Sequence, residues 1–452
     1  MKRLSRILFA LGTLVSIIAG LVVASGRVDG LSHNGSASAD VAFLSIVLYW
    51  ALGSCVCWCV ANCRESWRQI LLAGISVLLC LTALEVGLRI LRPSLALREF
   101  EFVRSAVQHH VLLPNTSYDL GMFEGRNVVV STNADRLRTS YSVEAFQAKS
   151  QRIVCLGDSF TFGAWVNAED SYPEQLEGIL GKQGMPDVGV LNAGMLSYSP
   201  LLHEQLMKKT LAKYSPTIVT LMLDCTDIGD DFHYALNIDR SSESLRFNGA
   251  GMAYSKPHFG ALWRLSKPVQ PAVLAPFRLL RRLDKRFRPH DPLDYYKFEI
   301  PVNDVTERDR FFIYRYPLEV TQSYFASCYE RILSIAEFCQ NNDMKFVLFV
   351  APRYHHWSLK ESPNNWEAKT YGDFKEHQYV IFEFFDGKMD EVSFPIVNML
   401  QPFQDTDEFP LVFDTDPHWN ERGNAFVARI IARELQKIAE TPTPALNADG
   451  KR

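Results

Sequence analysis

In the first half of the chain, the sequence reads Arg152-Ile-Val-Cys-Leu-Gly-Asp-Ser-Phe-Thr-Phe-Gly163. Its apolar run is typical of a buried strand, and the run breaks abruptly at Gly157-Asp158-Ser159. Open α/β sheets bind their ligands beyond the carboxyl ends of the strands, so Ser159 stands where a nucleophile would be presented. The alternative interpretation is an ordinary strand-to-helix turn, in which Gly157 relieves backbone strain and Ser159 or Thr161 caps the next helix. A base, an orienting acid and oxyanion donors elsewhere in the chain would favour the nucleophile.

Strand and helix signals alternate along the soluble part of the chain. We expect strands at residues 152–156, 188–191, 217–223, 345–350 and 394–399. We expect helices from the capping box Ser171-Tyr-Pro-Glu174 onward and at 201–213, 320–340 and 421–438. Because the strands are continuous apolar runs, they indicate a parallel sheet covered on both faces. Residues 233–315 break the alternation and are expected to be an insertion, and residues 441–452 resemble a disordered tail.

Residues 1–92 carry three apolar runs, each about long enough to cross a bilayer as a helix. They lie at about 7–24, 41–60 and 70–90. The first follows a basic segment and could be a signal peptide, but its apolar core is long and two more runs follow. We therefore expect three transmembrane helices.

The orientation follows from the basic residues around these runs. Basic residues precede the first run, and Arg64 and Arg68 lie between the second and third, so the positive-inside rule places both segments in the cytoplasm. Three crossings then deliver the soluble domain to the other side, although Arg89, Arg92 and Arg98 oppose this orientation. We expect a multi-pass protein of the cell membrane with an extracytoplasmic catalytic domain, periplasmic if the protein is bacterial.

Composition excludes several classes of function. The chain of 452 residues is 47% hydrophobic with a formal net charge of −4, which argues against nucleic acid as the main partner. A cysteine cluster at residues 55–63 lies in an apolar run and is expected to pack rather than to bind metal. The pairs His109-His110 and His355-His356 lack ligand spacing, so we expect them in loops or on the surface. No metal and no cofactor are expected.

A candidate base stands near the end of the chain, in Phe413-Asp-Thr-Asp-Pro-His-Trp-Asn420. A carboxylate on one ring nitrogen of a histidine holds the tautomer that can take a proton from serine. Asp416, two residues before His418, is close enough along the chain to reach that nitrogen, and Asp414 is kept in reserve. The alternative interpretation is a helix N-terminus that carries acidic residues because they suit the helix dipole.

Oxyanion donors are expected at the ends of three neighbouring strands. The Ser159 N–H lies at the turn itself, and Gly194 follows the strand at 188–191 within Asn192-Ala193-Gly194. The third strand end reads Asp224-Cys-Thr-Asp227. In a parallel sheet all these ends fall on one edge, so they predict a single site there.

These blocks, taken in order, resemble the SGNH/GDSL hydrolase superfamily. Gly157-Asp158-Ser159-Phe160 is similar to its first block, Asn192-Ala193-Gly194 to its second and Asp416-Pro-His418-Trp-Asn420 to its last. The resemblance covers roughly residues 97–438, including residues 133–138, which are similar to a segment of membrane-linked members. It implies a flavodoxin-like three-layer α/β sandwich with a parallel sheet. It also implies a serine nucleophile, a His–Asp pair and an oxyanion hole made by serine and glycine amides and an asparagine side chain.

Two departures from the family pattern matter. Thr226 stands where the third block usually has asparagine, and the loss of one oxyanion donor can lower the rate roughly 10²–10³-fold. The usual Asp-x-x-His spacing would fall on Thr415, whereas Asp416 and His418 resemble the Asp-x-His variant of alginate-type acetylation proteins. We assign Ser159 as nucleophile, His418 as base, Asp416 as the acid that orients it, and Ser159, Gly194 and Thr226 as the oxyanion hole.

The function expected from the resemblance is a membrane-anchored serine-dependent esterase. It would act on carboxyl esters, above all O-acetyl esters, of cell-envelope glycans or lipids. Alternatives are an O-acetyltransferase of a surface polysaccharide and a catalytically weak glycan-binding scaffold for a membrane acyltransferase. The expected partners are the lipid bilayer, an acylated glycan or other ester substrate, and a membrane acyltransferase. Four aromatic residues could stack on sugars, although core packing is their more common role: Tyr354, Trp357, Trp366 and Tyr371.

Overall fold

The computed structural model describes residues 102–236, 238, 299–308, 310–357, 361, 365 and 376–440. These residues belong to one compact unit of the chain. The three predicted transmembrane helices, most of the predicted insertion, Trp366, Tyr371 and the predicted tail lie outside them. None of the helices formed by the described residues combines the length and the hydrophobicity that a membrane span requires.

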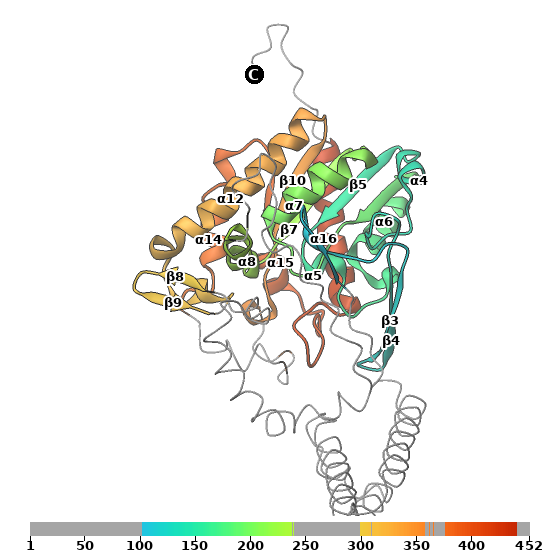
Figure 1. Cartoon of the computed structure of the whole chain (residues 1–452). Helices are drawn as coiled ribbons and strands as arrows, with labels where there is room; N and C mark the ends of the chain where they lie inside the picture. Colours follow the sequence, from blue (N-terminus) through green and yellow to red (C-terminus); the bar gives the residue numbers. More distant parts are fainter. Residues whose placement is uncertain are drawn as a thin grey trace, which may run out of the picture. The chain divides into compact units, whose positions relative to one another are not determined.

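The centre of this unit is a five-stranded parallel sheet in the order β11-β10-β7-β5-β6 (Figure 1). Its strands are β5 (Gln151–Leu156), β6 (Val188–Asn192), β7 (Ile218–Leu223), β10 (Lys345–Val350) and β11 (Ile396–Asn398). Each lies within two residues of the strand that the apolar runs predict, so the predicted parallel sheet is confirmed. The chain leaves β5 toward β6 and then crosses back to β7 on the other side. The carboxyl ends of β5 and β7 therefore form the switch point at which such sheets bind ligands.

Helices cover both faces of the sheet. On one face α7 (Pro200–Leu206), α8 (Thr226–Ala235) and α12 (Leu318–Asn341) pack on one another. On the other face α6 (Tyr172–Lys182) packs against α16 (Glu421–Glu440) (Figure 1). Alternate residues of β5 serve the two faces, because Ile153 and Cys155 join the buried cluster formed with α6 and α16. The predicted helix at 201–213 is helical throughout, but α7 passes into a π turn at Met207–Leu211 and a 3₁₀ turn at Ala212–Tyr214.

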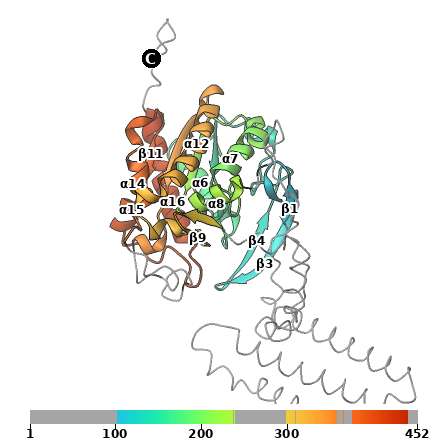
Figure 2. The same ribbon diagram turned by 60° about the vertical axis from the view of Figure 1, so that its left-hand side comes forward.

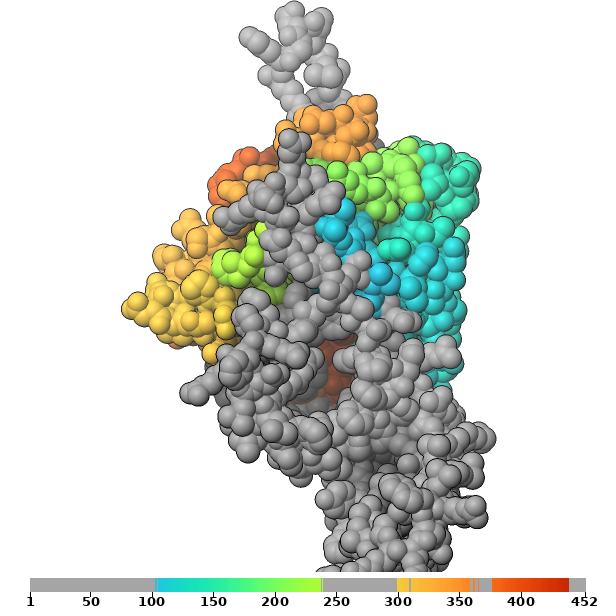
Figure 3. Space-filling view, viewed as in Figure 1, coloured from blue at the N-terminus to red at the C-terminus, as the bar shows by residue number. Residues whose placement is uncertain are grey.

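Three two-stranded antiparallel sheets lie outside the central sheet: β1 (Phe102–Ser105) with β2 (His109–Leu112), β3 (Ser117–Phe123) with β4 (Arg126–Ser131), and β8 (Ile300–Val302) with β9 (Val305–Glu307). The β3–β4 hairpin projects beyond the sheet in both ribbon views (Figure 2). In the space-filling view β3–β4 and β8–β9 occupy opposite edges of the face shown (Figure 3). The described residues also form the helices α4 (Val143–Gln147), α5 (Ser159–Phe162), α14 (Val380–Asp386) and α15 (Leu400–Asp405), with 3₁₀ turns at Ala168–Asp170, Phe312–Arg315, Tyr354–His356 and Met389–Glu391.

The expectation that the two histidine pairs are loop or surface residues is wrong for His109-His110, whereas His355-His356 do lie in a connecting segment but are buried there. His109 and His110 are buried on β2, and the two Nδ1 atoms are 2.8 Å apart. His355 and His356 are buried in a 3₁₀ turn, and Nε2 of His356 lies 2.7 Å from the Gln378 carbonyl oxygen. Burial lowers the pKa of His110 and of His356 to about 4. The rings of His110 and His356 are therefore neutral groups of the interior at physiological pH.

Candidate active site

Ser159 is the first residue of α5, directly beyond the carboxyl end of β5. Gly157 has φ of 155°, and a Cβ there would lie 2.0 Å from the Thr161 hydroxyl oxygen, so the turn requires glycine. The cap of α5 is Asp158, whose Oδ1 accepts the Phe160 N–H at 2.9 Å. The turn interpretation gave this role to Ser159 or Thr161. Because Asp158 performs it, the Ser159 hydroxyl is not needed as a cap and is available to a base.

Ser159, His418 and Asp416 meet in space although 259 residues separate Ser159 from His418. Ser159 Oγ lies 2.7 Å from His418 Nε2, and His418 Nδ1 lies 2.5 Å from Asp416 Oδ1. A carboxylate can only accept, so Nδ1 carries the ring proton and Nε2 is free to accept from the serine hydroxyl. The Asp158 carboxylate is a competing acceptor, 3.3 Å from Ser159 Oγ. The shorter contact favours His418.

The chain holds His418 in place through its neighbours. Trp419 is 1% exposed and forms an isolated antiparallel bridge with Val412. The Asn420 side chain donates to the carbonyl oxygens of Pro410 and Val412 and accepts the Gly423 N–H at the start of α16. These hydrogen bonds tie together the parts of the segment 410–423 that flank His418, and so they fix the position of the histidine. Asp414, the reserve acid, lies on the exposed side of the same segment.

The ionisation of the pair fits a base and its orienting acid. Burial lowers the pKa of His418, but the charge and hydrogen bond of Asp416 outweigh it, so that the net pKa lies above the ordinary 6.5. Burial raises the pKa of Asp416, and the His418 charge and hydrogen bonds more than reverse this effect. Asp416 is thus an anion near neutral pH, which is the state that orients and stabilises an imidazolium.

The other two predicted oxyanion residues have their donors engaged inside the protein. The Gly194 N–H donates to Asn192 Oδ1 at 3.0 Å, and a Cβ on Gly194 would lie 2.2 Å from the Phe162 backbone nitrogen. Glycine is required there for close packing of the β6 end against α5. The N–H and the hydroxyl of Thr226 both donate to Asp224 Oδ1 at 2.6 Å. The structure therefore does not direct the Thr226 hydroxyl at Ser159 Oγ, and the oxyanion roles of Gly194 and Thr226 stay predictions.

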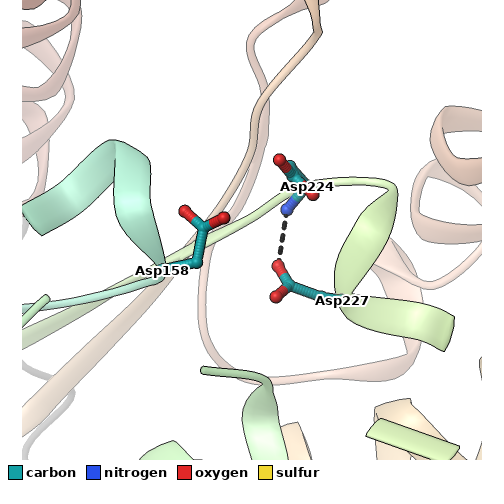
Figure 4. A group of neighbouring side chains, drawn as sticks. All are labelled: Asp158, Asp224 and Asp227. Carbon is teal, nitrogen blue, oxygen red and sulfur yellow. Dashed lines mark hydrogen bonds between the residues drawn. The ribbon is translucent and has the colours of Figure 1, made fainter. Parts of the chain in front are cut away.

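A buried group of charges that the sequence reasoning missed lies beside the serine. The carboxylates of Asp158, Asp224 and Asp227 approach within 4.8 Å of one another at the ends of β5 and β7 (Figure 4). Arg353 Nη1 binds Asp224 Oδ2 at 2.6 Å, and its guanidinium lies 5.0 Å from the centre of the Phe160 ring. Burial and the Asp224 charge raise the pKa of Asp158 to about 6. In the sequence, the signal for this group is a basic residue, Arg353, shortly after the strand β10.

Carboxylate oxygens are the ligands that Ca²⁺ and Mg²⁺ prefer, so three carboxylates this close together could in principle bind a cation. Asp224 already binds Arg353 and Thr226, and Asp227 Oδ2 accepts the Asp224 N–H at 2.8 Å. Burial and neighbouring acids raise the pKa of Asp227 well above its ordinary value, which favours its neutral form. Hydrogen bonds from protein groups, the charge of Arg353 and the protonation of Asp227 thus offset the negative charge of the cluster, and we assign no metal to it.

A hollow of about 340 Å³ lies next to the His–Asp segment. Its wall combines the tip of the β3–β4 hairpin with residues on both sides of Asp416 and His418, including Phe123, Glu124, Arg126, Phe413, Asp414 and Glu421. Of the predicted sugar-stacking residues, the two that the structure describes, Tyr354 and Trp357, are not in this wall. Tyr354 is buried, and Trp357 packs on Phe403 with ring centres 4.6 Å apart.

Comparison with known proteins gives structural likeness only. No protein-family model and no curated protein matches the sequence. Similar solved structures include a catalytic mutant of Axe2, an acetylxylan esterase from Geobacillus stearothermophilus (12% identity, 64% of this chain and 95% of that chain, TM-score 0.31). Others are a GDSL-like lipase from Bacteroides thetaiotaomicron (12%, 66% and 93%, 0.31) and the psychrotrophic esterase EstA from Pseudoalteromonas sp. (9%, 64% and 98%, 0.31). At these values the likeness carries no argument about activity, which rests on the geometry of Ser159, His418 and Asp416.

Proposed function

We propose that this protein is a serine-dependent enzyme acting on carboxyl esters. The observation that carries the proposal is the continuous hydrogen-bonded chain from Ser159 through His418 to Asp416 at the switch point of a parallel sheet. A serine hydroxyl beside an imidazole that is itself bound to a carboxylate is the arrangement that makes serine nucleophilic.

The chemistry follows from this geometry. Ser159 Oγ attacks the ester carbonyl carbon while its proton passes to His418 Nε2, and Asp416 stabilises the imidazolium that forms. The imidazolium then returns the proton to the departing alcohol, which leaves an acyl group on Ser159. Water, or the hydroxyl of an acceptor, then attacks the acyl carbonyl carbon while its proton passes to His418 Nε2. The imidazolium returns the proton to Ser159 Oγ as the acyl–oxygen bond breaks, which restores the free serine. The Ser159 N–H, at the start of α5, is the donor best placed by the backbone to meet the developing oxyanion.

We further propose that the ester is an O-acetyl ester of a cell-envelope glycan or lipid and that the enzyme is anchored in the membrane. The three apolar runs of residues 1–92 support the anchor, and the positive-inside rule supports an extracytoplasmic catalytic domain. The hollow lined by residues on both sides of the His418 segment, with aromatic and carboxylate groups in its wall, supports an alcohol part that carries many hydroxyls. Transfer of the acyl group to a polysaccharide is the alternative outcome of the same acyl-enzyme.

One observation favours a second candidate. In the family that the sequence resembles, an asparagine at the position of Thr226 supplies the third oxyanion donor. The Thr226 hydroxyl instead donates to Asp224. This favours a weakly catalytic domain that holds a glycan for a membrane acyltransferase.

The test compares the wild type with Ser159→Ala and with the matched control Ser142→Ala. Ser142 caps the remote helix α4 and touches none of the three residues. We expect hydrolysis of p-nitrophenyl acetate by wild type and control, none above background by Ser159→Ala, and an acetyl group on Ser159 by mass spectrometry. Equal background rates in all three would reject the enzyme and favour the scaffold. Offering glycan acceptors to the acetylated protein then separates hydrolysis from transfer.

A further inference from the structure

One segment outside the central sheet contacts both halves of the candidate active site. We call residues 117–138 the clasp: the β3–β4 hairpin and the turn that follows it. Among the described residues, β3 and β4 pair only with each other. The central sheet therefore gains no strand pairing from the hairpin, and the contacts between the hairpin and the site need another explanation.

The far end of the clasp grips the nucleophile side. Arg138 is 3% exposed, and it donates to the carbonyl oxygens of Phe162, Gly163 and Val166, each at 2.6 Å. These carbonyls lie at the end of α5 and in the turn after it, where a cation suits the helix dipole. Arg138 thus fixes the short helix whose first residue is Ser159.

The tip of the clasp grips the acid side. Glu124, at φ of 41°, accepts the Asp414 N–H at 3.1 Å and both the N–H and the hydroxyl of Thr415 at 2.8 Å. Asp414 and Thr415 are exposed and immediately precede Asp416. One carboxylate from a hairpin 290 residues away therefore receives three hydrogen bonds from the segment that carries the acid.

Aromatic rings join the two grips. Phe123 stacks on Trp165 with ring centres 4.5 Å apart and planes at 16°, and it meets Phe413 edge-on at 5.0 Å. Trp165 has φ of 67°, an unusual conformation for so large a residue and one that the surrounding structure must hold. Its side chain interacts with Asp416 and thereby helps to lower the pKa of that carboxyl.

We propose that the clasp is a positioning element that holds Asp416 against His418, and that Glu124 is the positioning residue at its tip. The inference rests on the proposed function, because it concerns the orientation of that triad. A triad built from segments this far apart needs outer contacts to stay aligned, since small displacements of reacting groups lower rates steeply.

The test compares Glu124→Ala, Glu124→Gln and the matched control Asp119→Ala. Asp119 is an acid on β3 whose Oδ1 accepts the Gly121 N–H within the hairpin, away from residues 413–416. For Glu124→Ala we expect kcat on an acetyl ester to fall about tenfold to a hundredfold with KM unchanged. Glu124→Gln keeps a carbonyl oxygen that accepts hydrogen bonds, so it should restore much of the rate. Asp119→Ala should match the wild type.

A pH profile separates positioning from a general structural role. The groups that act on His418 are Asp416 and Asp158, which raise its pKa, and Arg353, which lowers it. When Asp416 is held less firmly, it raises the pKa of His418 less. The pKa of His418 therefore falls in Glu124→Ala, and the acid limb of kcat/KM moves to lower pH. A structural role alone would lower the melting temperature and leave this limb in place.

The outcomes distinguish the clasp from the proposed function. If Ser159→Ala is inactive while Glu124→Ala keeps the wild-type kcat and acid limb, the clasp is refuted and the enzyme stands. If the wild type shows no turnover, the pKa of His418 is read by NMR instead. A lower value in Glu124→Ala than in Asp119→Ala would still support the clasp, and equal values would refute it.

Discussion

Replacement of Asp416 by asparagine tests the most specific feature of the site. His418 donates twice to the same oxygen, from Nδ1 at 2.5 Å and from its backbone N–H at 3.0 Å. An asparagine satisfies both donors only when its carbonyl oxygen takes the place of Asp416 Oδ1. That orientation keeps the proton on Nδ1, so the tautomer that serine needs survives. The variant therefore removes the charge and keeps both hydrogen bonds from His418.

The expected loss follows from that distinction. An aspartate-to-asparagine change that also forces the wrong tautomer lowers kcat about 10⁴-fold. Here only the electrostatic stabilisation of the imidazolium is lost, and each unit of pKa is worth about 1.4 kcal/mol, or a factor of ten in rate. We expect kcat/KM for an acetyl ester to fall roughly 10²–10³-fold.

The assay is kcat/KM for an acetyl ester measured across pH. His418 acts as a base only when it is unprotonated, so activity falls as pH drops through its pKa, which Asp416 holds above 6.5 in the wild type. In Asp416→Asn the acid limb should move to lower pH. The control is Asp414→Asn, two residues upstream, which should keep both rate and limb. A loss of about 10⁴-fold or more in a folded variant would refute the argument about the amide orientation. An acid limb that does not move would refute the assignment of Asp416 itself.

Three further predictions concern the neighbouring charges and the membrane region. Thr226→Val removes the hydroxyl that donates to Asp224, so urea unfolding should show a loss of about 1–2 kcal/mol with turnover nearly unchanged; lost turnover without lost stability would mean that the hydroxyl meets the substrate. Asp158→Asn keeps the α5 cap and removes a carboxyl whose folded pKa is raised to about 6 from 3.8. The variant should therefore be more stable than wild type by up to about 3 kcal/mol at pH 8 and not at pH 3, and no gain at pH 8 would contradict the raised pKa. A reporter that works only in the cytoplasm, fused after Arg452, should be silent, and a bright signal would overturn the predicted orientation.

Local pattern in the sequence determined most of the fold and the three residues of the proposed triad. The apolar runs predicted all five strands of the parallel sheet, because a strand buried on both faces is apolar at most of its positions. The break at Gly157 predicted the turn that presents Ser159, because only glycine fits there. Asp416 and His418 were found together because their pairing is local, over two residues.

The tertiary structure alone decided which partner each polar group takes. The sequence shows Thr226 and Asp224 two residues apart, but not that Arg353, 129 residues away, holds Asp224 in the interior. It likewise shows no reason for Glu124 to meet Thr415. Burial of the four paired histidines was missed for the same reason, since adjacent histidines have no periodicity that marks a face. Hydrogen bonds between distant segments, and the burial of their side chains, depend on how the whole chain packs. A pattern of neighbouring residues does not specify that packing.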